Sequence, residues 1–194
     1  IKSYSNLWTQ QTGFDSRSQL ATVSFPPQTP SVQVREDVDR TVDALRRLAA
    51  KPTGALAGPL LDSFMTIGGP GLTIAGRRFR MASRLVTTDY FAAAGIHLKA
   101  GRYFAATDRP TETLIVNDAF VREYFADRDA TNLIGERFER NGAVGTITGV
   151  VRDVFDQALD KLPAPSIFQL MDTPDPRMPV SFGVGASADQ VRPS

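Results

Sequence analysis

Cysteine is absent from the 194 residues of the sequence, and histidine occurs once. Without cysteine the chain has no disulfide and no thiolate metal site, and one histidine supplies at most one imidazole ligand. An excess of one charge is also missing, since 22 Lys and Arg residues against 21 Asp and Glu residues leave a formal net charge of +1. This balance removes the bulk electrostatic case for nucleic-acid binding, which depends on basic clusters that neutralise phosphates.

Long hydrophobic runs are lacking as well, because no apolar stretch approaches the roughly 20 residues that a membrane helix requires. The chain opens without a methionine, so we expect no signal peptide within it. Hydrophobic residues make up 42% of the sequence and charged residues 22%, a composition typical of globular proteins. The length is sufficient for one large domain or two small ones.

The clearest helix signal follows Pro30, where Ser31 is placed to cap a helix that Lys51-Pro52 would end. One face of this helix is aliphatic, with residues at the three-and-four spacing of a buried stripe: Val34, Val38, Val42, Leu45, Leu48 and Ala49. Strands are expected before it, over 20–25, and after it, within 55–65. This part of the sequence therefore predicts a strand–helix–strand unit.

The central stretch, residues 85–104, predicts a tightly packed corner. Thr88 is expected to cap a short helix, and Asp89 to lie in its first turn beside the positive end of the helix dipole. Gly95 can adopt the left-handed conformation that ends a helix. One face of the helix would bury Tyr90, Phe91 and Ala94.

Turn and cap signals organise the rest of the chain. Asn117 follows a short buried strand and is expected to cap a helix over 118–125. Asn141-Gly142 is typical of a type I′ hairpin turn, because both residues tolerate positive φ angles. Further strands are expected over 72–75 and 79–87, as a hairpin around Gly76, and over 136–139, 144–151, 166–170 and 180–184.

The sequence offers little for catalysis or metal binding. His97 lies between Ile96 and Leu98 with no nucleophile motif nearby, which favours a structural or exposed position over a catalytic one. The best group of carboxylates, Asp153, Asp156 and Asp160, lacks the glycine-containing pattern of a calcium loop, and a solvated acidic face is favoured.

Two further segments are weighed as binding sites. The loop Gly68–Gly71 lacks the Lys-Ser/Thr that follows a phosphate-binding loop, so a flexible turn is favoured. A basic strand carries Arg77, Arg78, Arg80 and Arg84, of which alternation places the last three on one face. These arginines could meet lipid headgroups or an acidic partner, or only keep a sheet face soluble. The sequence predicts no catalytic, cofactor-binding or metal-binding residue and no cofactor.

Five motifs then occur in a fixed order. Residues 86–104 read V-T-T-D-Y-F-x-x-x-G-I-x-L-x-x-G-R-x-F, with Asp108 shortly after. The others are LIVNDAFVREYF (114–125), NLIGERF (132–138), TITGVVRDV (146–154) and LPAPSIFQL (162–170). In order and spacing the set resembles the periplasmic core domain of MacB-like, FtsX-type ABC-transporter permeases. The likeness is closest to orphan permeases, which carry this domain without an ATPase on the same chain.

The resemblance implies an α+β fold of two parts. Residues 1–65 and 166–194 would form a porter-like βαβ subdomain whose C-terminal half is truncated, and residues 66–165 an inserted, mixed and mostly β, Sabre-like subdomain. It also implies a non-catalytic domain on the periplasmic or extracytoplasmic face of the inner membrane, which transmits ATP-driven conformational change across that membrane (mechanotransmission).

The expected partners are the transmembrane helices of the chain's own permease and a separate ATP-binding subunit, with a second permease copy or a periplasmic adaptor as further possibilities and nucleic acid excluded. Two other functions stay open on the sequence. One is an extracytoplasmic module that binds a ligand or an adaptor protein, which would need a concave pocket or a large exposed apolar patch. The other is a hydrolase, for which the sequence offers no nucleophile–base pair.

Overall fold

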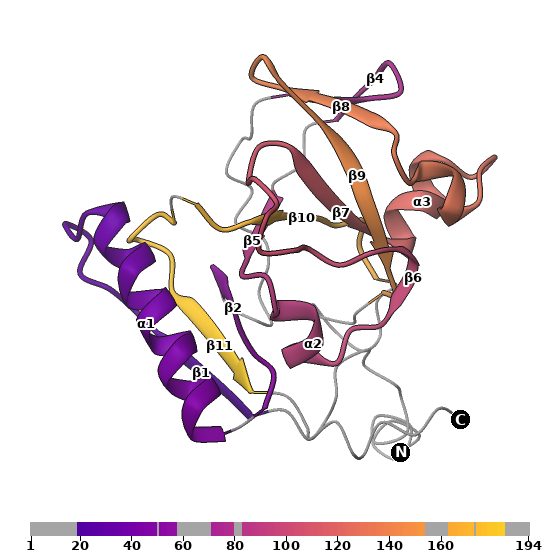
Figure 1. Ribbon diagram of the computed structural model, residues 1–194. Helices are drawn as coiled ribbons and strands as arrows, with labels where there is room; N and C mark the ends of the chain where they lie inside the picture. The colour runs from indigo at the N-terminus through magenta and orange to yellow at the C-terminus, as the bar shows by residue number, and fades with distance from the viewer. Residues whose placement is uncertain are drawn as a thin grey trace, which may run out of the picture.

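The computed structural model describes residues 19–49, 51–57, 71–79, 83–153, 163–172 and 174–184 (Figure 1). Within them the fold is mixed α+β, as the sequence predicts, with one sheet ordered β1-β11-β2-β5-β10-β7-β9-β8-β3-β4 and β6 added on β9. The strands are β1 (Gln19–Val23), β2 (Thr53–Ala57), β3 (Leu72–Ile74), β4 (Arg77–Phe79), β5 (Ser83–Val86), β6 (Leu98–Gly101), β7 (Thr113–Asn117), β8 (Arg137–Arg140), β9 (Ala143–Val151), β10 (Ile167–Leu170) and β11 (Val180–Val184). The helices are α1 (Ser31–Ala49), α2 (Tyr90–Ala94), α3 (Asp118–Tyr124) and the short 3₁₀ helix η1 (Ala130–Leu133).

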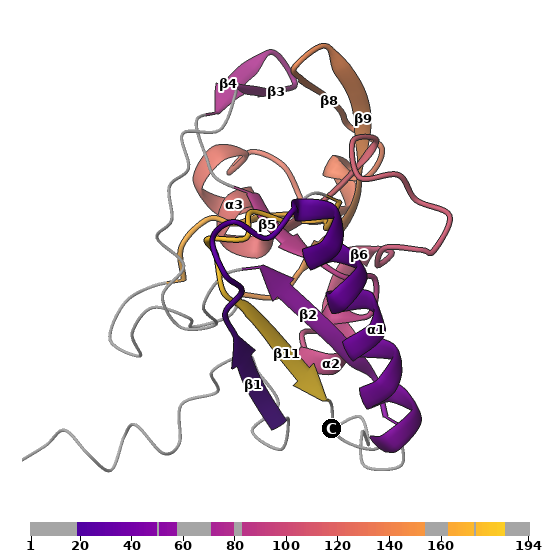
Figure 2. The ribbon, with the colours of Figure 1, turned by 90° about the vertical axis from the view of Figure 1, so that its left-hand side faces the viewer.

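Helix α1 covers one face of the three-stranded part formed by β1, β11 and β2 (Figures 1 and 2). Its buried face packs with β2 and β11 in one apolar cluster: Val34, Val38, Val42, Ala55, Met171, Val180 and Phe182. β11 lies between β1 and β2 and runs antiparallel to both, so the predicted strand–helix–strand unit is confirmed with β11 inserted between its strands.

Two predictions about α1 are wrong in detail. The carbonyl of Pro30 accepts the first helical hydrogen bond, from the Val34 amide at 3.0 Å, so Pro30 occupies the cap position and Ser31 is the first helical residue. Leu48 is 85% exposed, because the apolar stripe outruns the strands that it packs on. The buried stripe therefore ends near Leu45, which is partly buried.

The larger part of the sheet is built around β7, whose five residues are all buried. β7 pairs parallel with β9 and antiparallel with β10, and β10 in turn pairs parallel with β5. α3 follows β7 directly, and Asn117 caps it as predicted, since its Oδ1 accepts the Phe120 amide at 3.1 Å. Below α3 lies the largest apolar cluster, which includes Phe79, Phe120, Phe125, Phe138 and Ile147.

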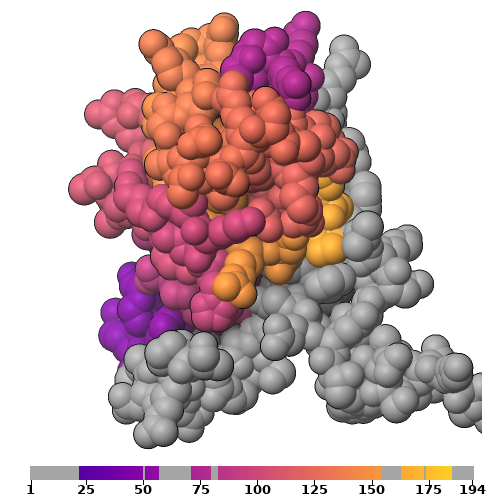
Figure 3. All heavy atoms as spheres, turned by 90° about the vertical axis from the view of Figure 1, so that its right-hand side faces the viewer, coloured from indigo at the N-terminus to yellow at the C-terminus, as the bar shows by residue number. Residues whose placement is uncertain are grey.

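The β3–β4 and β8–β9 hairpins lie together at one end of the described part of the molecule (Figures 1 and 3). The β3–β4 turn has positive φ at Ala75 and Gly76, and the β8–β9 turn has positive φ at Asn141 and Gly142, which confirms both predicted turns. The predicted strand over 79–87 is wrong as a single element. β4 ends at Phe79, and β5 pairs instead with β2 and β10.

The central corner contains the end of β5, the short helix α2 and the strand β6. Its helix α2 buries Tyr90, Phe91 and Ala94, and Gly95 ends it with φ 68°, as predicted. Asp89, not Thr88, occupies the cap position, and its side chain does not bond to the helix. The reason is that Asp89 turns its carboxylate outward to an arginine of α1, at 2.7 Å.

Candidate functional site

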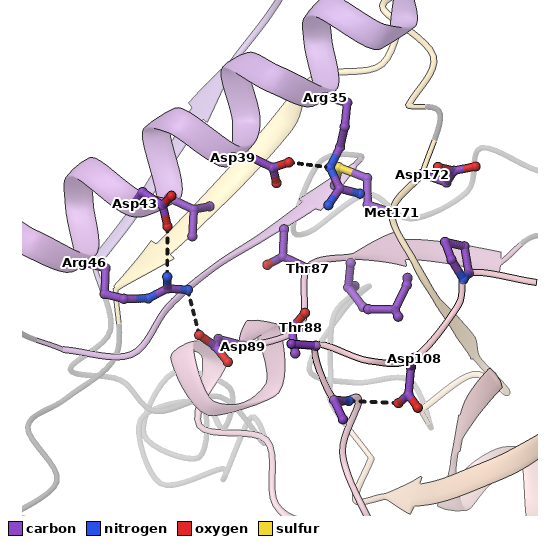
Figure 4. Close-up of a pocket in the computed structure, with 16 residues that line it drawn as sticks. Arg35, Asp39, Asp43, Arg46, Thr87, Thr88, Asp89, Asp108, Met171 and Asp172 are labelled. Carbon is purple, nitrogen blue, oxygen red and sulfur yellow. Dashed lines mark hydrogen bonds and ion pairs between the residues drawn. The ribbon is translucent and has the colours of Figure 1, made fainter. Parts of the chain in front are cut away.

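A groove of about 600 Å³ separates α1 from the loop that follows the corner (Figure 4). One wall is the charged face of α1. The other consists of Thr87 to Asp89 and the segment around Asp108, and Leu170 to Asp172 also line the groove. Four stretches far apart in the sequence meet here, so no local pattern predicts the groove. It is the hollow at which the strand–helix–strand unit faces the rest of the molecule.

Arg46 bridges the groove at one end. Its Nη1 donates to Oδ1 of Asp43 on the same helix at 2.9 Å, and its Nη2 donates to Oδ2 of Asp89 at 2.7 Å. The Arg46 and Asp89 side chains are 46% and 44% exposed. Ion pairs this exposed contribute at most about 1 kcal/mol. The bridge therefore sets orientation more than it adds stability.

A bidentate ion pair holds the opposite wall. Nη1 and Nη2 of Arg102 donate to the two carboxylate oxygens of Asp108 at 2.6 and 2.8 Å, and the Ala105 amide donates to the same carboxylate at 2.8 Å. The hydrogen bonds from the Arg102 guanidinium lower the pKa of Asp108. The Asp108 side chain is only 8% exposed, so its bonds to Arg102 are largely shielded from water. They hold the loop against the residue that follows β6.

Thr87 joins the corner to β2 beneath the groove. Its amide donates to the carbonyl of Ala55 at 2.9 Å, and its hydroxyl accepts the Ala55 amide at 2.7 Å. β5 also pairs with β2 directly through Leu56↔Val86 and Ala57↔Leu85. The corner is thus attached to the strand–helix–strand unit by backbone as well as side-chain hydrogen bonds.

The groove is acidic. Five carboxylates and two guanidinium groups line it: Asp39, Asp43, Asp89, Asp108, Asp172, Arg35 and Arg46. Across the part of the chain that the structure describes, no three acidic or imidazole side chains lie close enough to hold a metal ion. The arrangement offers ion pairing and hydrogen bonding, and the carboxylates of Asp39, Asp43, Asp89 and Asp108 are already bonded to arginines.

The structure disperses the other residues that the sequence singles out. His97 is exposed, and its carbonyl accepts the Arg152 amide at 2.9 Å. Asp153 accepts the Ala119 amide and an Arg122 N–H, both at 2.7 Å, so it stabilises the start of α3; Asp156 and Asp160 lie outside the described residues.

The arginines predicted to share one strand are divided between two. Arg77 and Arg78 lie in β4, whereas Arg84 lies in β5, and Arg80 and the loop at 68–70 fall outside the described residues. Arg77 bonds to the carbonyl of Tyr124 and lies 5.5 Å from the ring centroid of Phe125, while Arg84 lies over Phe168. The two described arginines of the predicted face, Arg78 and Arg84, therefore lie in different strands, since β4 pairs with β3 whereas β5 pairs with β2 and β10.

Among the described residues, no helix has the length and apolarity needed to cross a bilayer. No protein-family model and no curated protein matches the sequence.

Two solved structures are similar along most of the chain. One is the periplasmic region of MacB from Actinobacillus actinomycetemcomitans, with a TM-score of 0.54 and 12% identity over 93% of this chain and 78% of that one. The other is the extracellular domain of the noncanonic ABC-type transporter YknZ from Gram-positive bacteria, with a TM-score of 0.53 and 13% identity over 89% of this chain and 87% of that one. The chain therefore has the fold of the MacB-type periplasmic domain, the family that its five sequence motifs resemble.

Proposed function

We propose that this chain is the non-catalytic extracytoplasmic domain of an ABC-transporter permease and that it transmits ATP-driven conformational change across the membrane. The fold it shares with the domains of MacB and YknZ supports the location on the outer side of the cytoplasmic membrane. On this proposal the transmembrane helices belong to the same permease, the ATPase is a separate subunit, and a second permease copy or a periplasmic adaptor completes the assembly.

One observation carries the proposal: the sheet runs without a break from the edge strand β1 to the hairpins at the far end. Along it, β2 contributes Ala55 to the cluster under α1 and Leu56 to the cluster under α2. β10 likewise contributes Ile167 to the largest cluster and Phe168 to the cluster under α2. Because close-packed interiors transmit strain, a displacement of α1 would move the distant hairpins.

We further propose the division into a porter-like subdomain, residues 1–65 and 166–194, and a Sabre-like subdomain, residues 66–165. The apolar clusters support it. The buried residues of the cluster under α1 come from 34–55 and 171–182, and those of the largest cluster come from 72–150, with Ile167 of β10 as the one member from the other part. The groove beside Arg46 then marks the junction of the two parts, and the hydrogen bonds between Thr87 and Ala55 connect them.

The full-length permease, with its ATPase subunit in proteoliposomes, tests the proposal. Deletion of residues 66–165 is expected to uncouple ATP hydrolysis from transport, because the part of the domain that receives the movement of α1 is lost. The matched control is Arg109→Ala, which removes only an exposed pair with Glu112. If the deletion leaves both hydrolysis and transport at the wild-type level, the proposed transmission of conformational change is wrong.

A second candidate function is an extracytoplasmic binding module for a ligand or an adaptor protein. The groove beside α1 favours it, because a concave site of about 600 Å³ is large enough for a small molecule. Its lining is rich in charged and polar side chains, unlike the largely apolar pockets that small molecules prefer. A thermal-shift screen separates the two functions. A binding module should show a ligand-dependent rise in melting temperature that Asp43→Asn weakens, whereas a domain that only transmits movement should show none.

A further inference from the structure

Arg140, Ser83 and Gln169 meet from three strands. Arg140 is the last residue of β8, Ser83 the first of β5, and Gln169 lies in β10. Nη1 of Arg140 donates to Oγ of Ser83 at 2.7 Å and also to Oε1 of Gln169. Two other strands, β7 and β9, separate β10 from β8 in the sheet, so Arg140 reaches residues that are not on a neighbouring strand.

The positive charge of Arg140 has no counter-charge among the described residues. Eight described arginines pair with carboxylates, namely Arg35, Arg40, Arg46, Arg102, Arg109, Arg122, Arg128 and Arg177. Arg140 instead contacts a hydroxyl and an amide, both neutral. It is half-buried, and this burial lowers its pKa, so the charged form is held in an unfavourable setting. Charges shielded from water are ordinarily paired, which makes this arrangement unusual.

The hydrogen-bonding capacity that remains in this group consists of donors. Ser83 and Gln169 each use an oxygen to accept from Arg140, which leaves the Ser83 O–H and the Gln169 Nε2–H₂ free to donate. Arg140 keeps its Nε and Nη2 donors. No described side-chain nitrogen or oxygen is both buried and without a partner, so these donors are open to solvent. Water can satisfy these donors in the free protein, and the oxygens of an anion can replace that water.

We propose that Arg140, Ser83 and Gln169 form an oxyanion-binding site that takes a carboxylate or a phosphate group. The guanidinium fork matches two oxygens of such a group, and charge-assisted bonds of this kind are roughly twice as strong as neutral ones. Ser83 and Gln169 hold Nη1, which leaves the edge formed by Nε and Nη2 to face such a group. Strand alternation turns the neighbouring Arg84 to the other face of β5, where it lies 5.7 Å from the ring centroid of Phe168.

Anion binding is tested on the purified chain by its melting temperature in phosphate, acetate and chloride at equal ionic strength. We expect phosphate or acetate to raise the melting temperature in a saturable manner relative to chloride, by about 2–4 °C for each 1 kcal/mol of binding free energy. The anion that stabilises more identifies the ligand as a phosphate or a carboxylate. Arg140→Met should abolish the shift, whereas Arg137→Met, an exposed arginine on the same strand, should keep it.

Gln169→Glu provides a variant that does not depend on removing Arg140. It is nearly isosteric and places a carboxylate on the guanidinium, in effect filling the site. We expect it to raise the melting temperature in chloride and to lose the response to phosphate and acetate. In the wild-type protein, the Arg140 Nε–H resonance should also shift during the titration, whether or not Arg140→Met folds.

Three results would overturn the site. Equal stabilisation by phosphate, acetate and chloride would reduce the effect to general screening. An undiminished response in Gln169→Glu would place the anion elsewhere. An Arg140 resonance that stays fixed while the melting temperature rises would do the same.

Discussion

The backbone of Gly54 lies directly against the backbone of Tyr90. A Cβ built on Gly54 would be 2.5 Å from the Tyr90 Cα and 2.6 Å from its amide nitrogen, far inside van der Waals contact. β2 and α2 therefore approach each other as closely as two main chains can, and only glycine fits. This contact holds the corner against the strand–helix–strand unit.

Gly54→Ala is expected to destabilise the protein by about 3 kcal/mol, at the upper end of the range for overpacking, because the atoms it meets are backbone and cannot rotate away. The matched control is Gly76→Ala, which has open space around it but a φ of 75°, and should cost about 1 kcal/mol. Urea unfolding measures both. Equal losses in the two variants would show that β2 and α2 can separate at little cost.

Asn117 joins three elements with one buried side chain, which is 3% exposed. Its Oδ1 accepts the amides of Phe120 and Ser166 at 3.1 and 2.8 Å, and its Nδ2 donates to the Ala164 carbonyl at 2.9 Å. Asn117→Ala is expected to cost about 2–4 kcal/mol, since it removes a cap and leaves buried donors without a partner.

The exposed Asn132→Ala serves as the control for Asn117 and should change the free energy of unfolding by less than about 0.5 kcal/mol. Chemical denaturation of both variants gives the comparison. A loss below about 1 kcal/mol for Asn117→Ala would mean that the helix cap alone matters and that the link to Ser166 is dispensable.

Local signals predicted much of this fold correctly. Asn117 as a cap, Asn141-Gly142 as a hairpin turn and Gly95 as a helix end each depend on a few adjacent residues, and all three are confirmed. The strands that flank them follow from the same short-range patterns. Thr88 is not the cap, because the helix begins one residue later with Asp89 at the cap position. The Asp89 carboxylate bonds to Arg46, which is 43 positions away and therefore invisible to any local pattern.

Long-range pairing could not be predicted in this way. The parallel pairs β5–β10 and β7–β9, and the insertion of β11 between β1 and β2, leave no local trace because any apolar strand fits those positions. The groove and the contact of Arg140 with Gln169 depend on this pairing. Leu48 was misassigned for the same reason, since the helix pattern does not reveal where the sheet beneath it ends.

The ion pair of Arg46 with Asp89 is expected to contribute little to stability. A double-mutant cycle with Arg46→Ala and Asp89→Ala should give a coupling free energy of about 0.2–1 kcal/mol that declines with added salt, because both side chains are exposed. Val38→Ala, in the buried stripe of α1, should cost about 2 kcal/mol by comparison. A salt-independent coupling free energy above about 2 kcal/mol would instead show that the ion pair contributes substantially to holding α1 against the corner.

The stability of the loop around Asp108 should depend on pH. The Arg102 guanidinium lowers the pKa of Asp108 in the folded protein, so folding favours the ionised carboxylate. The resulting stabilisation is fully present above the unfolded-state pKa of about 3.9 and is lost as the pH falls through the lower folded-state pKa.

Asp108→Asn should therefore cost about 1–3 kcal/mol near neutral pH, and the difference from wild type should narrow as the pH falls through the lowered pKa of wild-type Asp108, where that side chain also becomes protonated. Arg102→Gln should return the pKa of Asp108 toward its ordinary value, which a ¹³C titration of the carboxyl group measures directly. Two results would contradict this: a wild-type carboxyl group that titrates at about 3.9, or a loss of unfolding free energy in Asp108→Asn that is equal at all pH values. Either would mean that packing and not charge holds this wall of the groove.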